Sequence, residues 1–128
     1  MAITLTGFYY AQNQEENEMI NYENEIARRY GVNAAIVADY LWELMEKHRY
    51  SGKSVYQYGK VWVRCSQPMI TSEIKFLTID MVRGAIKALL DGNIIRKYQF
   101  NKTRFDHTSW YSFTEYGEKL VKKGGSRT

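Results

Sequence analysis

The segment that most constrains the fold runs from residue 72 to residue 113. Within it, Thr78 precedes apolar residues that recur every three or four positions, the pattern of one face of an amphipathic helix. Threonine is a favoured N-cap because its hydroxyl accepts a bond from a free backbone N–H. Gly92 stands directly after the pattern, where a left-handed residue commonly ends a helix. The sequence therefore predicts a helix over 78–91, stopped by a left-handed Gly92. Its expected buried face comprises Ile79, Val82, Ala85, Ile86, Leu89 and Leu90.

A basic β-hairpin is expected directly after this helix. We predict strands over 94–100 and 108–113, joined by a polar tip over 101–107. Trp110 and Tyr111 fall on opposite faces of the return strand and are expected to be structural, and Asp106 is expected to shape the tip. Hairpins of this kind lie along the phosphate backbone or insert a side chain into the minor groove. The alternative is a plain hairpin whose charges prevent edge pairing.

Upstream, the pattern predicts a short helix over 22–30 and a longer one over 33–48 with Asn33 as its N-cap. Its apolar stripe comprises Ile36, Val37, Tyr40, Leu41, Leu44 and Met45. The glycines and serines of 50–59 indicate a loop.

The residues between that loop and the helix at 78 predict a strand and a further helix. KVWVR, residues 60–64, is short, β-branched and aromatic. Ser66 is the expected cap of a helix that carries Pro68 in its first turn and ends at Phe76 and Leu77. A short strand that pairs with a hairpin and packs on three helices is the layout of an α+β winged helix-turn-helix, the fold class predicted here with an extra N-terminal arm and helix.

The chain of 128 residues is one domain's worth of sequence. We predict an N-terminal arm over 1–22, a winged-helix domain over 23–117 and a flexible C-terminal tail over 118–128, with Gly117 interrupting a short C-terminal helix. No apolar run approaches the ~20 residues of a membrane span. We expect a cytoplasmic protein with no membrane partner.

Charge is distributed unevenly along the chain. Residues 1–50 carry eight acids against four bases, whereas residues 75–105 carry seven bases against two acids. Basic charge gathered on one structural unit is the footprint of a polyanionic partner. Chance clustering on a solvated surface is the alternative.

The helix over 78–91 is the expected recognition helix. Arg83 and Lys87 are spaced i, i+4 and share one exposed face, so Arg83 is a candidate for a guanine edge and Lys87 for a phosphate. Gly84 permits close approach, and Asp80 either serves the helix dipole or accepts a bond from a cytosine amine. Solubilising charge is the alternative reading of the two bases. The predicted DNA-binding residues are Lys75, Thr78, Met81, Arg83, Lys87, Lys97, Asn101, Lys102 and Arg104.

The phrase from Asn101 to Tyr111, NKTRFDHTSWY, resembles the hairpin of winged-helix domains at the N-terminus of replication-initiation and replisome-organiser proteins of phages and plasmids from Gram-positive bacteria. The resemblance spans residues 34–116 and implies duplex DNA binding in replication initiation. The helix before the turn, QPMITSEIKF, departs from the acidic, tryptophan-bearing helix of that family, and the 128 residues contain no counterpart of its C-terminal domain. The matching residues are Asp106, Thr108, Trp110 and Tyr111 in the hairpin, and Ala35, Ile36, Trp42, Gly59, Lys60, Trp62, Arg83, Ile86, Leu89, Ile94 and Ile95 elsewhere.

No residue pattern indicates catalysis, and we expect no enzyme, no cofactor, no small-molecule substrate and no metal site. Cys65 is the single cysteine and is expected to be buried, while His48 and His107 lack partners at ligand spacing. The eleven tyrosines either form a stacking surface for single strands or fill core and interface, and their dispersion favours the latter. The favoured function is double-stranded DNA binding in replication initiation or transcription regulation. The alternative is a protein-interaction module that forms a homodimer through the acidic arm and first helix.

Overall fold

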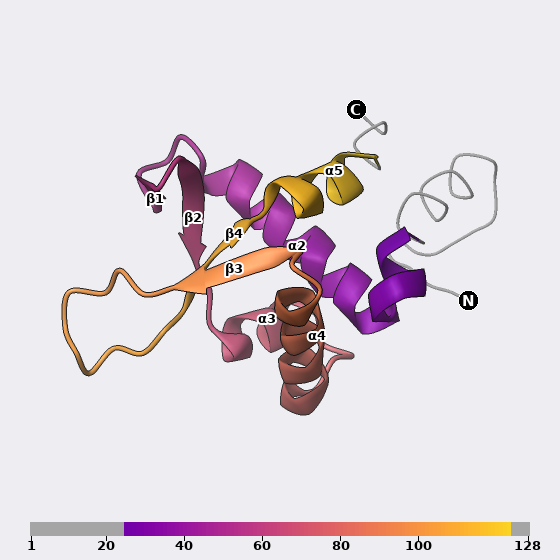
Figure 1. Ribbon diagram of the computed structural model, residues 1–128. Helices are drawn as coiled ribbons and strands as arrows, with labels where there is room; N and C mark the ends of the chain where they lie inside the picture. The colour runs from indigo at the N-terminus through magenta and orange to yellow at the C-terminus, as the bar shows by residue number, and fades with distance from the viewer. Residues whose placement is uncertain (1–24, 124–128) are drawn as a thin grey trace.

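The computed structural model describes residues 25–123, and the predicted arm over 1–22 lies outside the described residues. The protein is α+β, with a four-stranded antiparallel sheet and helices packed against it (Figure 1). A helical segment over 25–30 precedes the labelled elements. These are α2 (Val32–His48), β1 (Ser54–Gln57), β2 (Lys60–Arg64), α3 (Gln67–Glu73), α4 (Ile79–Asp91), β3 (Ile95–Tyr98), β4 (Trp110–Phe113) and α5 (Glu115–Lys123).

The strand order is β1-β2-β4-β3, so the strand after α3 and α4 lies at the edge and the return strand lies between it and β2. Val63 of β2 faces Tyr111 of β4, and Ile95 of β3 faces Phe113 of β4. The predicted strand over 60–64 is confirmed with its bounds, and the predicted hairpin is confirmed with strands shorter than the expected 94–100 and 108–113. An arrangement of β2, β4 and β3 on α2, α3 and α4 is compatible with a winged helix.

Strand β1 corrects the prediction that 50–59 is a loop. β1 pairs with β2 through a two-residue turn at Tyr58 and Gly59, whose φ angles of 56° and 72° are both positive. Such a type I′ turn is normally marked by asparagine and glycine. A tyrosine at its first central position gives no such signal, which is why the sequence did not show the hairpin.

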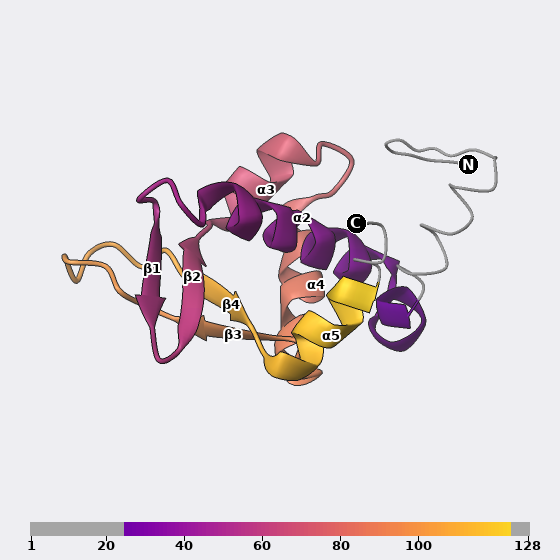
Figure 2. The ribbon, with the colours of Figure 1, turned by 90° about the horizontal axis from the view of Figure 1, so that it is seen from above.

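The core lies between the inner face of the sheet and the helices, which cover that face in Figures 1 and 2. The apolar stripe of α2 is confirmed and is used within the domain, with Val37 and Leu41 fully buried. Ile70 of α3, Leu89 of α4 and Ile95 of β3 are fully buried as well. The stripe of α2 therefore packs inside the domain, and the predicted homodimer through the arm and first helix stays a prediction.

Two helix ends differ from the prediction. Helix α2 begins at Val32, with Gly31 at the N-cap position, so Asn33 lies inside the helix. Ser66 caps α3 as predicted, its Oγ accepting a bond from the Met69 N–H at 3.2 Å. Helix α3 ends at Glu73, earlier than expected, and Phe76 beyond it is 65% exposed.

Helix α4 has the predicted N-cap and a different C-terminal geometry. Thr78 Oγ1 accepts a bond from the Met81 N–H at 3.1 Å. Gly92 has a φ of −82°, so the prediction of a left-handed glycine is wrong; the left-handed residue is Asn93, with a φ of 61°. Gly92 is instead needed for space, because a Cβ there would lie 2.3 Å from Cε1 of Tyr30.

Helix α5 corrects the prediction of a flexible tail from residue 118. Leu120 and Val121 are buried in the core, and Gly117 lies inside the helix rather than interrupting it. Thr114 Oγ1 accepts the Gly117 N–H at 2.8 Å and donates to the Asn93 carbonyl at 2.6 Å. A Cβ at residue 117 would lie 2.0 Å from the Ile94 carbonyl oxygen, so only glycine lets α5 approach the α4–β3 junction. Residues 124–128 of the predicted tail lie outside the described residues.

Candidate nucleic-acid interface

The exposed face of α4 carries its charges as two ion pairs. Arg83 Nη1 lies 2.5 Å from Asp80 Oδ1, and Lys87 Nζ lies 2.7 Å from Asp91 Oδ2. The bond from Asp91 raises the pKa of Lys87. Arg83 and Lys87 are exposed as predicted, but the face is electrically neutral in the free protein. Exposed pairs at i, i+3 and i, i+4 spacing are weak, so a phosphate can displace the carboxylates at little cost.

The residues at the start of α4 hold the helix end. Thr78 Oγ1 is engaged by the Met81 N–H, and the Thr78 N–H donates in turn to Met81 Sδ at 3.4 Å. Met81 remains 38% exposed, and Lys75 is exposed between α3 and α4. Thr78 and Met81 therefore have a structural role in the capping box of α4.

Gly84 lies on the exposed face of α4 between the two ion pairs. A Cβ at this position would meet nothing within 4 Å, so packing inside the protein does not require glycine here. Glycine in an exposed helix interior costs about 1 kcal/mol relative to alanine. The structure thus gives no internal reason for this residue, and a partner that approaches the α4 backbone would supply one.

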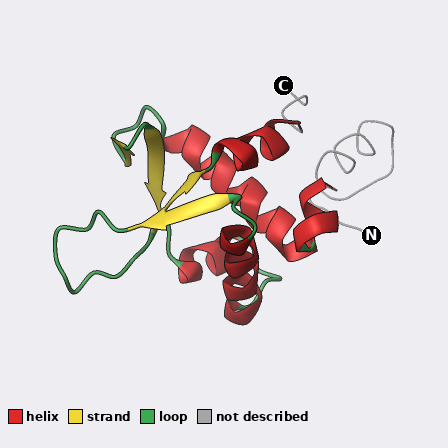
Figure 3. Cartoon of the chain, in the orientation of Figure 1, coloured by secondary structure: helices red, strands yellow, loops and turns green. Residues whose placement is uncertain are grey.

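The loop over residues 99–109, called here the β3–β4 loop, projects beyond the sheet, away from α2 and α5 (Figures 1 and 3). Asn101 holds its base. Its Nδ2 donates to the carbonyls of Asp106 at 2.8 Å and Thr108 at 2.7 Å, and its Oδ1 accepts the indole N–H of Trp110 at 2.8 Å. Asn101 is therefore a latch within the loop, although it was predicted as a DNA contact.

Asp106 shapes the loop as predicted. Its Oδ1 accepts the Thr108 N–H at 3.1 Å, and its Oδ2 accepts a bond from Arg64 Nη2 of β2 at 2.6 Å. The bonds to Thr108 first and Arg64 second lower the pKa of the Asp106 carboxyl to about 2. The loop is thereby tied to the neighbouring strand as well as to its own base.

Lys102 and Arg104 are exposed at the end of the loop, and residues 25–123 supply neither with an ion-pair partner. Between them and Asp106 lies Phe105, which is 80% exposed and has the Arg104 guanidinium carbon 5.4 Å from its ring centre. The sequence analysis placed Phe105 in the polar tip over 101–107 but did not include it among the predicted DNA-binding residues. An exposed aromatic ring next to Arg104 and close in sequence to Lys102 is suited to insertion between base pairs.

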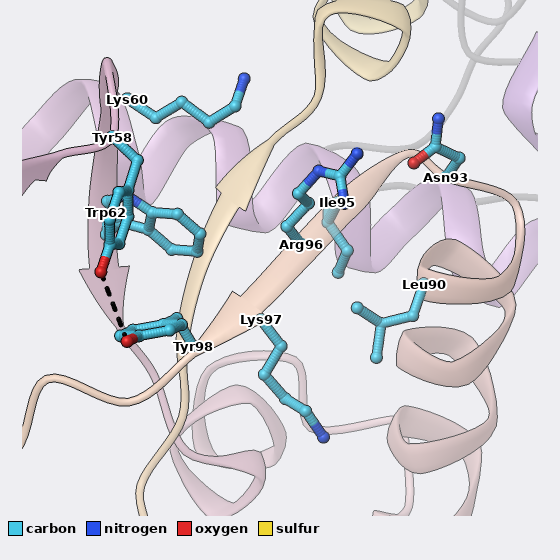
Figure 4. Close-up of a pocket in the computed structure, with 9 residues that line it drawn as sticks. All are labelled: Tyr58, Lys60, Trp62, Leu90, Asn93, Ile95, Arg96, Lys97 and Tyr98. Carbon is cyan, nitrogen blue, oxygen red and sulfur yellow. Dashed lines mark hydrogen bonds between the residues drawn. The ribbon is translucent and has the colours of Figure 1, made fainter.

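Strand β3 supplies two further bases that point to opposite faces of the sheet (Figure 4). Lys97, which was predicted, extends on the side of α4. Arg96, which was not among the predicted site residues, extends on the outer side. Both are exposed at the sheet edge.

Other chemistry is limited in the described part of the chain. Cys65 is buried as predicted, and burial raises the pKa of its thiol to about 12, so it is no nucleophile at neutral pH. Residues 25–123 contain no group of three or more histidine, cysteine, aspartate or glutamate side chains placed to hold a metal ion. Among these same residues, no helix has both the length and the apolar character needed to cross a bilayer.

Comparison of the chain with protein-family models, with curated proteins and with solved structures finds no match. The geometry of α4 and the β3–β4 loop is therefore the basis for the functional argument.

Proposed function

We propose that the protein is a non-enzymatic winged helix-turn-helix protein that binds double-stranded DNA in a sequence-specific manner. In this proposal α4 enters the major groove and the β3–β4 loop contacts the adjacent backbone or minor groove. The observation that carries the proposal is the topology: a capped helix pair precedes a hairpin whose return strand pairs with β2, and the hairpin ends in a projecting basic loop.

The charge of the loop side supports the proposal. This side of the protein carries one acid, Asp106, which is already bonded to Arg64, against five bases: Arg64, Arg96, Lys97, Lys102 and Arg104. Bases on one structural unit attract a polyanion and release its counterions on binding. The α4 face contributes its bases once Asp80 and Asp91 yield to phosphates.

The proposed cellular role rests on the resemblance of residues Asn101 to Tyr111 to the hairpin of winged-helix replication-initiation proteins. We propose DNA replication initiation or transcription regulation in a bacterium, a phage or another mobile element. Selection of bound sequences from a random duplex library separates these roles, because an enriched palindrome indicates a dimeric regulator and repeated direct sites indicate an origin binder.

The direct test is fluorescence anisotropy of a labelled duplex of about 25 base pairs titrated with the full chain between about 50 and 200 mM salt. We expect binding that weakens steeply with salt. Lys102→Ala with Arg104→Ala should lower the salt slope by about 2, since each phosphate contact contributes about 0.9. Arg83→Ala with Lys87→Ala should lower the slope by about 1 through Lys87 and weaken binding further through the lost Arg83 contact to a guanine edge.

The matched control is Lys47→Ala with Lys53→Ala, which removes two exposed bases outside α4 and the β3–β4 loop. It should leave the slope unchanged. Absence of duplex binding at low salt, or equal effects from all three double variants, refutes the proposal. A dimer in analytical ultracentrifugation without duplex binding would favour the protein-interaction alternative.

A further inference from the structure

The outer face of the sheet, opposite the core, carries a cluster of five aromatic residues. Strand alternation places Trp62 of β2, Tyr98 of β3 and Trp110 of β4 on this face, and Tyr58 and Phe100 join them from the adjoining turn and loop. Ring centres lie 5.5 Å apart for Tyr58 and Tyr98, 4.7 Å for Tyr98 and Phe100, and 5.7 Å for Phe100 and Trp110. The sheet thus has a continuous aromatic surface outside its core, called here the outer aromatic cluster.

Two members of the cluster are turned toward solvent. Tyr58 is 67% exposed and Tyr98 is 46% exposed, whereas Trp62 beneath them is buried. The Tyr58 hydroxyl donates to that of Tyr98 at 3.3 Å, which fixes the two rings relative to each other (Figure 4). The two ring planes meet at 72°, so a base can stack on one exposed ring and border the edge of the other.

Tyr58 occupies this place at the expense of backbone strain. Its φ of 56° is left-handed, a conformation that costs an ordinary residue about 1–2 kcal/mol and that asparagine or glycine adopts more easily. A strained residue of this kind is a reason to seek a function for its side chain. The ring that the turn presents is the candidate.

The cluster borders an open cavity of about 570 Å³. Its lining combines the aromatic residues Tyr58, Trp62 and Tyr98 with the bases Lys60 and Arg96, and continues around the edge of β3 to Lys97. None of the nine described residues that line it is acidic. Lys60 Nζ donates one bond, to the Phe113 carbonyl at 3.2 Å, and retains further protons for a ligand. The cavity therefore pairs flat apolar surface with unopposed positive charge.

We propose that this outer face binds an unpaired DNA strand, with a base stacked on the ring of Tyr58 and bordered by Tyr98, and with its phosphates held by Arg96 and Lys60. Stacking needs only the π-face of a base, and the bases track the backbone, so the site is expected to tolerate any sequence. Neither α4 nor the tip of the β3–β4 loop takes part. The site is thus distinct from the proposed duplex-binding surface and would bind a single strand exposed by local melting of the duplex.

The test is anisotropy of a labelled oligothymidylate of about 20 nucleotides with the full chain, beside the duplex used above. We expect the oligonucleotide to bind, and Arg96→Gln and Tyr58→Asn each to weaken it at least about fivefold. Tyr58→Asn is decisive because asparagine suits the left-handed turn: the variant should be at least as stable as the parent protein and yet bind less tightly. Tyr56→Thr removes a 72% exposed tyrosine from the neighbouring β1 and should leave binding unchanged.

An abasic oligonucleotide of the same length supplies phosphates without bases and should bind much more weakly. Equal affinity for it, equal displacement by polyglutamate, or unchanged binding by Tyr58→Asn overturns the proposal. Arg83→Ala with Lys87→Ala should impair the duplex and spare the oligonucleotide. Binding of the oligonucleotide without the duplex would thus refute the proposed function alone, and the reverse result would refute this site alone.

Discussion

Helix α4 and the β3–β4 loop both present exposed basic side chains, but different forces hold the two regions in place. Helix α4 is fixed by an apolar stripe, with Val82 and Leu89 fully buried, and by the cap at Thr78. The loop is fixed by polar side chains, chiefly Asn101 and Asp106. The charges differ in the same way, because those of α4 are paired with carboxylates and Lys102 and Arg104 of the loop are not. Packing therefore gives α4 a fixed position and shape for a groove, while the unpaired bases of the loop supply the charge that attracts phosphates.

The largest expected effect comes from the junction that both regions share. Gly117→Ala places a methyl group against the Ile94 carbonyl, between α4 and β3, where neither backbone can easily yield. We expect the free energy of unfolding to fall by about 3 kcal/mol, a value typical of severe overpacking. Chemical denaturation measures it, and Gly84→Ala is the comparison, because an added Cβ there meets nothing within 4 Å and the backbone is helical. An unfolding free energy no lower than that of the parent protein would contradict the contact.

The second largest effect is expected from removal of the Asn101 side chain, which holds the β3–β4 loop together. Asn101→Ala removes the bonds to the carbonyls of Asp106 and Thr108 and leaves the Trp110 indole N–H without its acceptor. We expect a loss of about 2 kcal/mol in unfolding free energy, at roughly 0.7 kcal/mol for each of the three net hydrogen bonds, together with weaker duplex binding. Thermal denaturation and hydrogen exchange check this, with Gln99→Ala as the control in the same loop. Unchanged exchange at the Trp110 indole would refute the latch.

The pairing of charges on α4 can be reversed directly. Asp80→Asn with Asp91→Asn frees Arg83 and Lys87 without removing a base. We expect duplex affinity at low salt to rise roughly tenfold, because two repulsive carboxylates are lost and two bases become available to phosphates. Titration of the labelled duplex measures the change. No gain would mean that α4 stands away from the DNA and that the loop alone attracts it.

Gly84 tests whether α4 approaches a partner closely. Gly84→Ala should raise the unfolding free energy by about 1 kcal/mol, because alanine is the better helix former and its methyl group meets nothing in the protein. If the α4 backbone lies against DNA, the same substitution should lower duplex affinity. Denaturation and anisotropy on one protein sample separate the two effects, and greater stability with unchanged affinity would exclude close approach at this point.

The smallest effect is on acid stability and concerns the loop. The folded pKa of Asp106 is about 2, below its ordinary value of 3.8, so its ionised form stabilises the loop. That contribution is fully present above about pH 4 and is lost as the pH falls toward 2. The indole N–H resonance of Trp110, followed by NMR between about pH 6 and 2, should shift over that range, and Asp106→Asn should abolish the transition. A transition that persists in Asp106→Asn would have another cause.

Local signals determined much of this protein. The caps at Ser66 and Thr78, the apolar stripes of α2 and α4, and the strand over 60–64 were readable because each depends on residues within a turn or two of one another. The basic residues Lys97, Lys102 and Arg104, and their position after the helix over 78–91, could likewise be identified from the sequence.

Contacts between distant residues decided the rest. From the sequence, Gly117 is interpreted as a helix breaker, whereas in the structure it makes room for the Ile94 carbonyl. Gly92 is interpreted as a left-handed helix end, whereas in the structure it makes room for the Tyr30 ring. The bases of α4 could be identified from the sequence, but their ion pairs with Asp80 and Asp91 could not. The aromatic residues of the outer face are far apart in the sequence and come together only in the folded sheet. Strand register and close packing join residues tens of positions apart, and no local pattern carries that information.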